Sequence, residues 1–182
     1  MTRKSFLQRL LALPSAALLI GCARSQSDPV DVPDDIRVHP DIGAFEPLDK
    51  SPDAWRPIVS EDAFYILFEE GTEPRYSSPL LEEKRRGTYL CAACRLPLFT
   101  SVTKYDSGTG WPSFWAPIEG RLGTKRDTKL AIPRTEYHCT RCGGHQGHVF
   151  EDGPDPTGLR YCNNGLALSF VPEDESLPPL RT

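Results

Sequence analysis

The chain has 182 residues, with 21 Lys and Arg against 25 Asp and Glu, and a formal net charge of −4 at pH 7. An acidic chain without a basic run argues against nucleic acid as a partner, because that binding depends on Lys and Arg that neutralise phosphates. The same composition argues against a polybasic membrane patch.

Residues 1–21 have the layout of a secretory signal peptide. A basic start is followed by an apolar run of eleven residues, 10–20, which is too short to span a bilayer. Without this segment, 18 basic and 25 acidic residues remain, a net charge of −7. The sequence "LIGC" resembles the lipobox of bacterial lipoproteins, so we expect cleavage before Cys22 and a lipid on Cys22. A plain signal peptide with a chance cysteine is the alternative.

The start of the chain also bears on the export route. "TRKSFLQ" loosely resembles a twin-arginine export signal, although Lys4 replaces the second arginine.

Residues 22–53 predict a lipid-anchored, proline-rich tether. Six prolines lie between Asp28 and Pro57, among acids and few large apolar residues. Such a composition buries too little surface to offset the entropy of ordering. Fully extended, thirty residues would reach on the order of 90 Å. The alternative is a segment wrapped on the domain surface near Trp55.

Residues 54–171 predict one globular domain, followed by a C-terminal tail over residues 172–182. "SEDAFYILFEEG" begins with a helix N-cap, Ser60, carries acids in its first turn and ends at Gly71. After Gly87 the chain changes to short β-type runs broken by Gly and Pro. These runs are "GTYLC", "LPLFTSVTKY", "TEYHC", "HVF", "LRYC" and "LALSF". We therefore expect a mainly β fold of twisted antiparallel sheets with a short helical N-terminal segment.

Two C-x-x-C pairs predict a structural Zn²⁺ site that joins two turns. The pairs are Cys91 with Cys94 and Cys139 with Cys142, separated by 44 residues. Gly143 can adopt the left-handed backbone that follows such a turn. Arg95 holds the equivalent place after Cys94, where a left-handed backbone would cost about 1–2 kcal/mol. Two disulfides, or a redox C-x-x-C pair, are the alternatives in an exported protein.

Cys162 is then the sixth cysteine, left over in the strand "LRYCNN". Alternation along a strand would place Arg160, Cys162 and Asn164 on one face. A cation two residues away favours the nucleophilic thiolate, and Asn164 can hold a water or a polar substrate group. A buried, inert cysteine is the alternative.

Two further segments supply candidate site residues. His145 and His148 are three residues apart, and one of them can protonate a leaving oxygen near neutral pH; the rival interpretation makes both zinc ligands beside Cys139 and Cys142. The loop "SGTGWPSFW" carries Trp111 and Phe114, which could wall a small ligand. Alternatively these aromatic residues belong to the core, and Phe114 is a better candidate for the core than Trp111.

These segments together resemble the methionine sulfoxide reductase B family. The resemblance runs from about Trp55 to Phe170 through "GTEPRY", "GTYLCAAC", "LFTSVTKYDSGTGWPSF", "RTEYHCTRCGGHQGHVFEDGPDPTGLRYCNN" and "LALSF". It implies a zinc-containing, mainly β fold that reduces the R epimer of methionine sulfoxide. It also implies site roles: Cys162 as catalytic nucleophile, Arg160 as support for its thiolate, Trp111 at the substrate methyl group, and sulfoxide-oxygen contacts at His145, His148 and Asn164. Asp152 matches a supporting acid that orients a histidine.

In this chemistry the Cys162 thiolate attacks the sulfoxide sulfur and becomes a sulfenic acid, which a second thiol reduces. Many members of the family carry a resolving cysteine before "GWPSF", but this chain has Thr109 there. We therefore expect an external reductant, a thioredoxin-like protein or a small thiol. Gln146, Asn163 and Gly165 also depart from the common pattern of the family.

The expected protein is a monomer in the bacterial cell envelope, held by lipid on Cys22 and facing the periplasm, where it would repair proteins after oxidative stress. Its substrate would be free methionine sulfoxide or proteins that contain it. A zinc module that only binds partner proteins is the alternative of a different class. Such a module would not need Cys162 and both histidines together with Arg160, Asn164 and Trp111.

Overall fold

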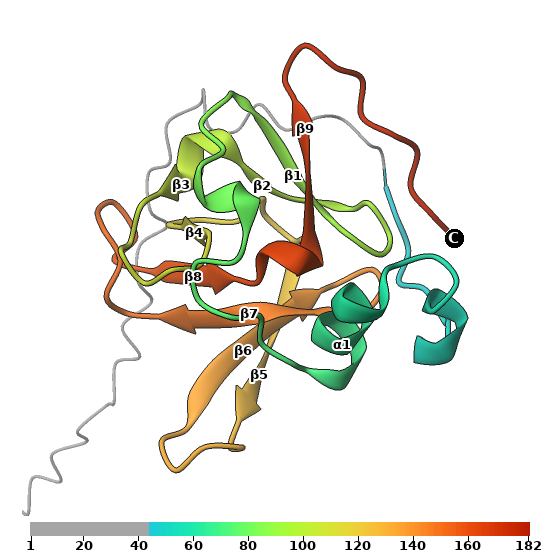
Figure 1. Ribbon diagram of the computed structural model, residues 1–182, viewed down its shortest axis with the longest axis horizontal. Coiled ribbons are helices and arrows are strands. Elements are labelled where there is room, and N and C mark those ends of the chain that lie inside the picture. Colours follow the sequence, from blue (N-terminus) through green and yellow to red (C-terminus); the bar gives the residue numbers. More distant parts are fainter. Residues whose placement is uncertain (1–43) are drawn as a thin grey trace, which may run out of the picture.

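A computed structural model describes residues 44–182 of the chain, and Cys22 and the expected signal peptide lie outside them. Antiparallel sheets, two in number within residues 44–182, account for most of the regular structure, as the sequence predicted (Figure 1). The smaller sheet has the strand order β2-β1-β9 and the larger has the order β3-β4-β8-β7-β6-β5. The strands are β1 (Gly87–Cys91), β2 (Pro97–Thr100), β3 (Lys104–Tyr105), β4 (Ser113–Phe114), β5 (Leu122–Asp127), β6 (Arg134–Cys139), β7 (His145–Phe150), β8 (Arg160–Asn163) and β9 (Leu168–Pro172).

Helix α1 (Glu61–Glu69) begins where the sequence predicted it. The Ser60 hydroxyl accepts a hydrogen bond from the Ala63 amide, which satisfies one of the free donors at the helix start. The helix ends at Glu69, two residues before the expected Gly71, because Glu70 itself adopts the left-handed conformation with φ 55°. Phe64, Ile66 and Leu67 turn inward, and α1 packs beside β7.

Aromatic side chains join the two sheets. Phe99 of β2 stacks on Phe114 of β4 with ring centroids 4.1 Å apart, and Tyr89 of β1 meets Phe114 edge-on at 4.9 Å. Tyr137 of β6 contacts Phe99 from the other side. All four residues are fully buried, and each contributes roughly 1.5–3 kcal/mol through burial. This core holds the larger sheet firmly from one side.

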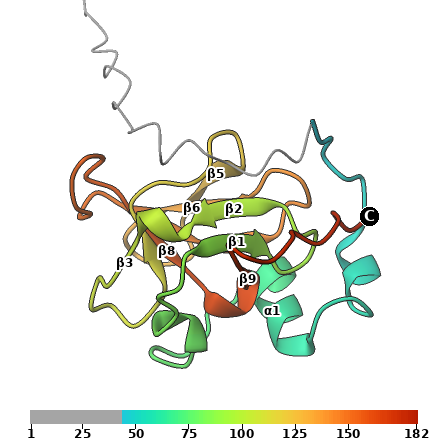
Figure 2. The same ribbon diagram turned by 90° about the horizontal axis from the view of Figure 1, so that it is seen from above.

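Both ends of the described chain pack on the domain. Phe45 and Leu48 lie against the core, so the packed region reaches back into the segment predicted as a tether. Leu180 packs against the same core from the tail, and Lys50 Nζ donates to the Thr182 carbonyl at 3.0 Å. The two ends therefore lie side by side (Figure 2). None of the helices in residues 44–182 is long and apolar enough to cross a membrane.

Candidate active site and metal site

A row of cross-strand neighbours builds the site on one face of the larger sheet. Ser113 of β4 pairs with Cys162 of β8, Cys162 pairs with His148 of β7, and His148 pairs with Glu136 of β6. Directly paired residues in an antiparallel sheet point to the same face. The strand register therefore brings the candidate nucleophile and a candidate proton donor next to each other.

A bulge in β7 brings the second histidine to the same face. In a regular strand His145 and His148 would point to opposite faces, because they are three residues apart. The β6–β7 pairing shifts between Tyr137 and His138, and Gln146 is the extra residue. The two imidazole rings consequently lie 5.4 Å apart.

Gly147 allows β7 and β8 to approach closely at this point. A Cβ atom on Gly147 would lie 1.9 Å from the Cys162 carbonyl oxygen, a distance that no side chain tolerates. The glycine between the histidines is thus required for the closeness of His148 and Cys162.

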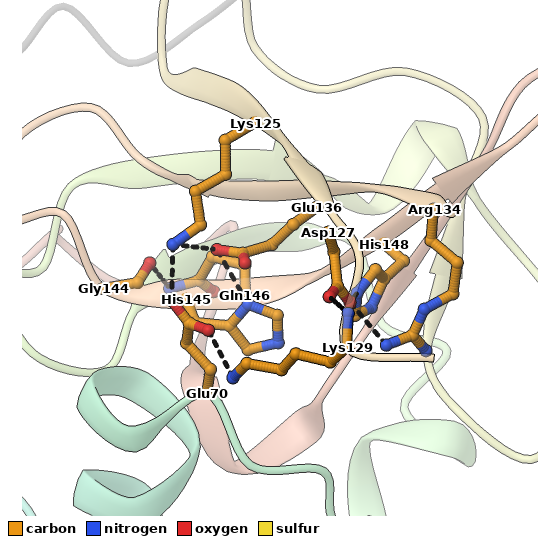
Figure 3. Close-up of polar contacts among 10 residues, drawn as sticks. All are labelled: Glu70, Lys125, Asp127, Lys129, Arg134, Glu136, Gly144, His145, Gln146 and His148. Atoms are coloured by element: carbon orange, nitrogen blue, oxygen red, sulfur yellow. Dashed lines mark hydrogen bonds and ion pairs between the residues drawn. The ribbon is translucent and has the colours of Figure 1, made fainter. Parts of the chain in front are cut away.

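Each histidine has its own acid: Asp127 of β5, two strands away in the sheet, faces His148, and Glu136 of the adjacent strand β6 faces His145 (Figure 3). The His148 Nε2 atom lies 2.7 Å from Asp127 Oδ2 in a hydrogen bond. His145 Nδ1 lies 3.1 Å from Glu136 Oε1, but this pair lacks hydrogen-bond geometry, and both ring nitrogens of His145 are buried without a hydrogen-bond partner among residues 44–182. Burial lowers the pKa of both histidines, and the acids oppose that shift.

Burial raises the pKa of the Cys162 thiol, and two neighbours oppose the shift. The Arg160 guanidinium and a hydrogen bond from the Thr109 hydroxyl favour the thiolate. Arg160 is in turn fixed by a bidentate pair with Asp152, at 2.8 Å and 2.9 Å. Asp152 therefore supports Arg160; the expectation that it orients a histidine is wrong, because Asp127 and Glu136 occupy those places.

A small cavity of about 100 Å³ opens over Cys162. His148 and Asn164 line it, and Trp111 and Phe150 supply its apolar walls. His145 lies behind His148 and does not reach the cavity. The cavity thus offers a nucleophile, a titratable nitrogen and an aromatic surface to one small group.

Glu73 fixes two residues of this cavity. Its carbonyl accepts from the Trp111 indole Nε1 at 3.1 Å, and its amide donates to Asn164 Oδ1 at 3.1 Å. Its carboxylate accepts from the Gly165 and Leu166 amides, which ends the strand in a 3₁₀ turn, η5 (Gly165–Ala167). The strand alternation expected for Arg160, Cys162 and Asn164 therefore ends with β8 at Asn163, and Leu166 beyond it is 39% exposed.

Phe114 was expected at the substrate, and the structure places it elsewhere. Its ring is fully buried and stacked between the two sheets. Ser113, its neighbour in the two-residue strand β4, takes the face toward Cys162, so Phe114 must point to the opposite face. Trp111, which precedes the strand, is the aromatic residue of this loop that lines the cavity.

The four C-x-x-C cysteines form a candidate metal site at the other side of the core. Their sulfur atoms all lie within 4.8 Å of one another, with Cys91 and Cys142 at 3.6 Å and Cys94 and Cys139 at 3.5 Å. A disulfide would place two sulfurs about 2.05 Å apart, and all four cysteines are free thiols. Four sulfurs at about 2.3 Å from a central ion would be about 3.8 Å apart in a tetrahedron. The residues therefore fit a tetrahedral metal ion better than two disulfides.

The residue after each cysteine pair is left-handed in both turns of this metal site. Gly143 follows the second pair with φ 74°, and Arg95 follows the first with φ 63°. Backbone donors near both ends of the described residues hold the turns. The Leu48 amide donates to the Arg141 carbonyl at 2.6 Å, and the Arg181 amide donates to the Cys94 carbonyl at 3.0 Å.

Sequence reasoning missed three residues of the site: Glu73, Asp127 and Glu136. Glu136 stands in "RTEY", within a predicted strand, and its side-chain face could have been read from the alternation with His138. Asp127 ends β5, "LGTKRD", whose lack of apolar alternation concealed a strand. Glu73 gave no local signal, since its partners are about 90 residues away.

Comparison with known proteins agrees with this geometry. A family profile described as SelR domain matches residues 59–172. A peptide methionine sulfoxide reductase MsrB from Pseudomonas putida is 48% identical over 131 residues, which cover 71% of this chain and 98% of the relative. Another with the same description, from Methanosarcina barkeri, is 46% identical over 133 residues, 72% of this chain and 94% of the relative. The chain belongs to the SelR domain family, the methionine sulfoxide reductase B family.

Proposed function

We propose that the chain is a peptide-methionine (R)-S-oxide reductase that uses Cys162 as its nucleophile. One observation carries the proposal: Cys162 and His148 are cross-strand neighbours in the floor of a cavity that Trp111 also lines. A methyl sulfoxide has the matching groups, since its methyl group is apolar, its sulfur is electrophilic and its oxygen accepts a proton. The non-enzymatic binding module is disfavoured, because a binder needs none of these contacts.

The reaction follows from the positions of the groups. His148 takes the proton of the Cys162 thiol, the resulting thiolate attacks the sulfoxide sulfur, and His148 passes the proton on to the sulfoxide oxygen. The oxygen passes to Cys162, which becomes a sulfenic acid, and methionine leaves with a reduced sulfur. Sulfur of Cys162 is oxidised by two electrons and sulfur of methionine is reduced by two. Trp111 selects the methyl group by apolar contact.

An external thiol completes the cycle. Thr109 occupies the place of a resolving cysteine, and the four cysteines of the metal site are buried or nearly so. Two thiols convert the sulfenic acid back to a thiol, with release of water and formation of a disulfide between them. A thioredoxin-like protein or a small thiol fits this role.

The test of the reaction is an assay on both epimers of a methionine sulfoxide peptide with an added thiol. Reduction of the R epimer alone supports the proposal, and failure on both epimers contradicts it. A second arm treats the domain with excess sulfoxide in the absence of thiol, traps with dimedone and maps adducts by mass spectrometry. An adduct on Cys162 is expected; a disulfide between Cys162 and another cysteine of the chain would rule out the one-cysteine cycle.

We further propose zinc as the ion of the four-cysteine site. Tetrahedral thiolate coordination is typical of structural Zn²⁺, and the sulfur separations support it. When bound, the ion would hold the turn after β1 to the turn after β6 and contribute to folding. It would have no role in the reaction, because all four ligand positions are filled by cysteines.

The cellular place of the enzyme is also a proposal. The "LIGC" segment supports a chain that is exported and lipidated on Cys22, and multiple acyl chains would hold it firmly to a bacterial envelope membrane. Such an enzyme would face the periplasm and repair oxidised envelope proteins. Mass spectrometry of the mature N-terminus tests this, with Cys22→Ala expected to release the protein from membranes; a soluble wild-type protein that begins after Cys22 would contradict it.

A further inference from the structure

Asp127 lies at the end of β5, on the same face of the sheet as Cys162 and His148. It pairs with Arg134 of β6, two residues before the Glu136 that pairs with His148. The Asp127 residue is only 7% exposed, which is unusual for a carboxylate. A buried charge persists only when it is paired, so its partners identify its role.

Three donors surround the Asp127 carboxylate. Oδ1 accepts from the Lys129 amide at 2.9 Å. Oδ2 accepts from Arg134 Nη2 at 2.5 Å and from His148 Nε2 at 2.7 Å. These donors hold the pKa of Asp127 well below its usual range, so the carboxylate is ionised at neutral pH.

An ionised carboxylate is an acceptor only. His148 Nε2 must therefore carry the hydrogen of the 2.7 Å contact, and Nδ1 is the remaining ring nitrogen. His148 lines the cavity over Cys162, so Nδ1 is the nitrogen available to a substrate oxygen. His145 differs, because the carboxylate beside it, Glu136, makes no hydrogen bond of good geometry to its ring.

From these contacts we propose that Asp127 is the positioning residue for His148, fixing the hydrogen on Nε2 so that Nδ1 exchanges the proton with the sulfoxide oxygen. The role of Nδ1 in the reaction rests on the proposed function. The position of the hydrogen on Nε2 does not, because it follows from the contact with Asp127 alone. Asp127 touches neither the substrate nor Cys162. It affects the reaction only through His148, in the way that a carboxylate beside a catalytic histidine generally fixes the orientation and tautomer of the ring.

The electrostatic surroundings of His148 make the idea testable, because two neighbours act on it in opposite directions. Asp127 raises the pKa of the imidazole and Arg134 lowers it, against a larger lowering from burial. The charged or titratable groups around the ring are Asp127 on β5, Arg134 and Glu136 on β6, His145 on β7 and Cys162 on β8.

The first measurement determines which ring nitrogen of His148 carries the proton in the wild-type protein. The chain has four histidines, and the spectrum of His148→Gln assigns the signal of His148 in a ¹⁵N-histidine-labelled sample. The neutral ring should carry its proton on Nε2. A proton on Nδ1 overturns the proposal, and this result does not depend on any activity.

The second measurement compares Asp127→Asn with Arg134→Gln. Loss of the carboxylate should move the pKa of His148 down, whereas loss of the cation should move it up. Asp127→Asn should also lower kcat by about 10–100-fold, and Asp127→Glu should recover some of that loss. Asp174→Asn, an exposed acid on the tail, controls for net charge and should match the wild type.

The third arm measures coupling. In a His148→Gln background, Asp127→Asn should cause little additional loss of kcat, because the two residues act as one unit. An equal loss in both backgrounds overturns the proposal, as does an Asp127→Asn variant with wild-type kcat and an unshifted His148. A wild-type enzyme inactive on both epimers would refute the proposed function, while the histidine titrations would still decide the role of Asp127.

Discussion

The thiol group occurs in two different surroundings in this protein, at Cys162 and in the cluster of four cysteines. The cluster lies between two turns that accept backbone hydrogen bonds from Leu48 and Arg181, and its sulfurs face one another, with the Gln146 amide donating to Cys91 Sγ at 3.5 Å. Cys162 lies in a strand ladder beside a cavity, with Arg160 and His148 as neighbours. A thiol surrounded by thiols is suited to bind a metal, and a thiol beside a cation and a titratable ring is suited to react.

The sharpest way to break this comparison is to remove one sulfur from each region. Cys162→Ser should leave the fold intact and lower turnover by about 10⁴-fold or more, because a hydroxyl is far less ionised than a thiol. Steady-state reduction of the R epimer, with circular dichroism on the same sample, measures both properties. Turnover near the wild-type rate would refute Cys162 as the nucleophile.

Cys94→Ser should show the opposite pattern, a loss of fold with the nucleophile still present. The variant should bind less than one zinc per chain and lose several kcal/mol of the free energy of unfolding, since structural zinc contributes directly to folding. Metal analysis and thermal unfolding measure this, and a chelator should have the same effect on the wild type. A wild-type domain without zinc, in which two disulfides join these cysteines, would overturn the assignment.

A smaller effect is expected from the cation beside Cys162. Arg160→Met should raise the pKa of the thiol further, because burial then acts without its main opposing charge. The thiolate is the reactive form, so the rise of kcat/KM with pH should move to higher pH. Activity at neutral pH should fall by roughly tenfold and recover at alkaline pH. An unshifted pH profile would show that Arg160 has no electrostatic role.

The sequence alone was sufficient for the regions of the molecule that depend on local pattern. The helix start at Ser60, strands β1 and β6 and the cysteine clustering all followed from nearby residues. The C-x-x-C motif is a local signal that occurs twice in the chain, which makes the metal site easy to recognise.

The expectations that failed depend on contacts between distant strands. β5 has a polar, exposed pattern, because only its Asp127 end is buried under a neighbouring strand. The bulge at Gln146 reverses the face of His145, and no residue type marks it. Asp152 was assigned to a histidine from the family resemblance, whereas the fold brings Arg160 to it. The strand register decides which of these side chains meet, and a single sequence does not reveal the register.

The smallest expected effect compares the two turns of the metal site. Gly143 and Arg95 occupy equivalent left-handed positions, but only glycine adopts that conformation without cost. Gly143→Ala should therefore destabilise the domain by about 1 kcal/mol, and the cause would be conformational, since nothing lies within 4 Å of the added Cβ. Arg95→Gly should stabilise it by up to about 1 kcal/mol, reduced by the lost contact of Arg95 Nη1 with the Pro179 carbonyl at 3.5 Å. Denaturant unfolding of the zinc-loaded protein measures both changes, with activity and zinc content expected to stay at wild-type values. Changes of the same sign in the two variants would show that the turns are held by the metal alone and that their backbone conformations carry no separate cost.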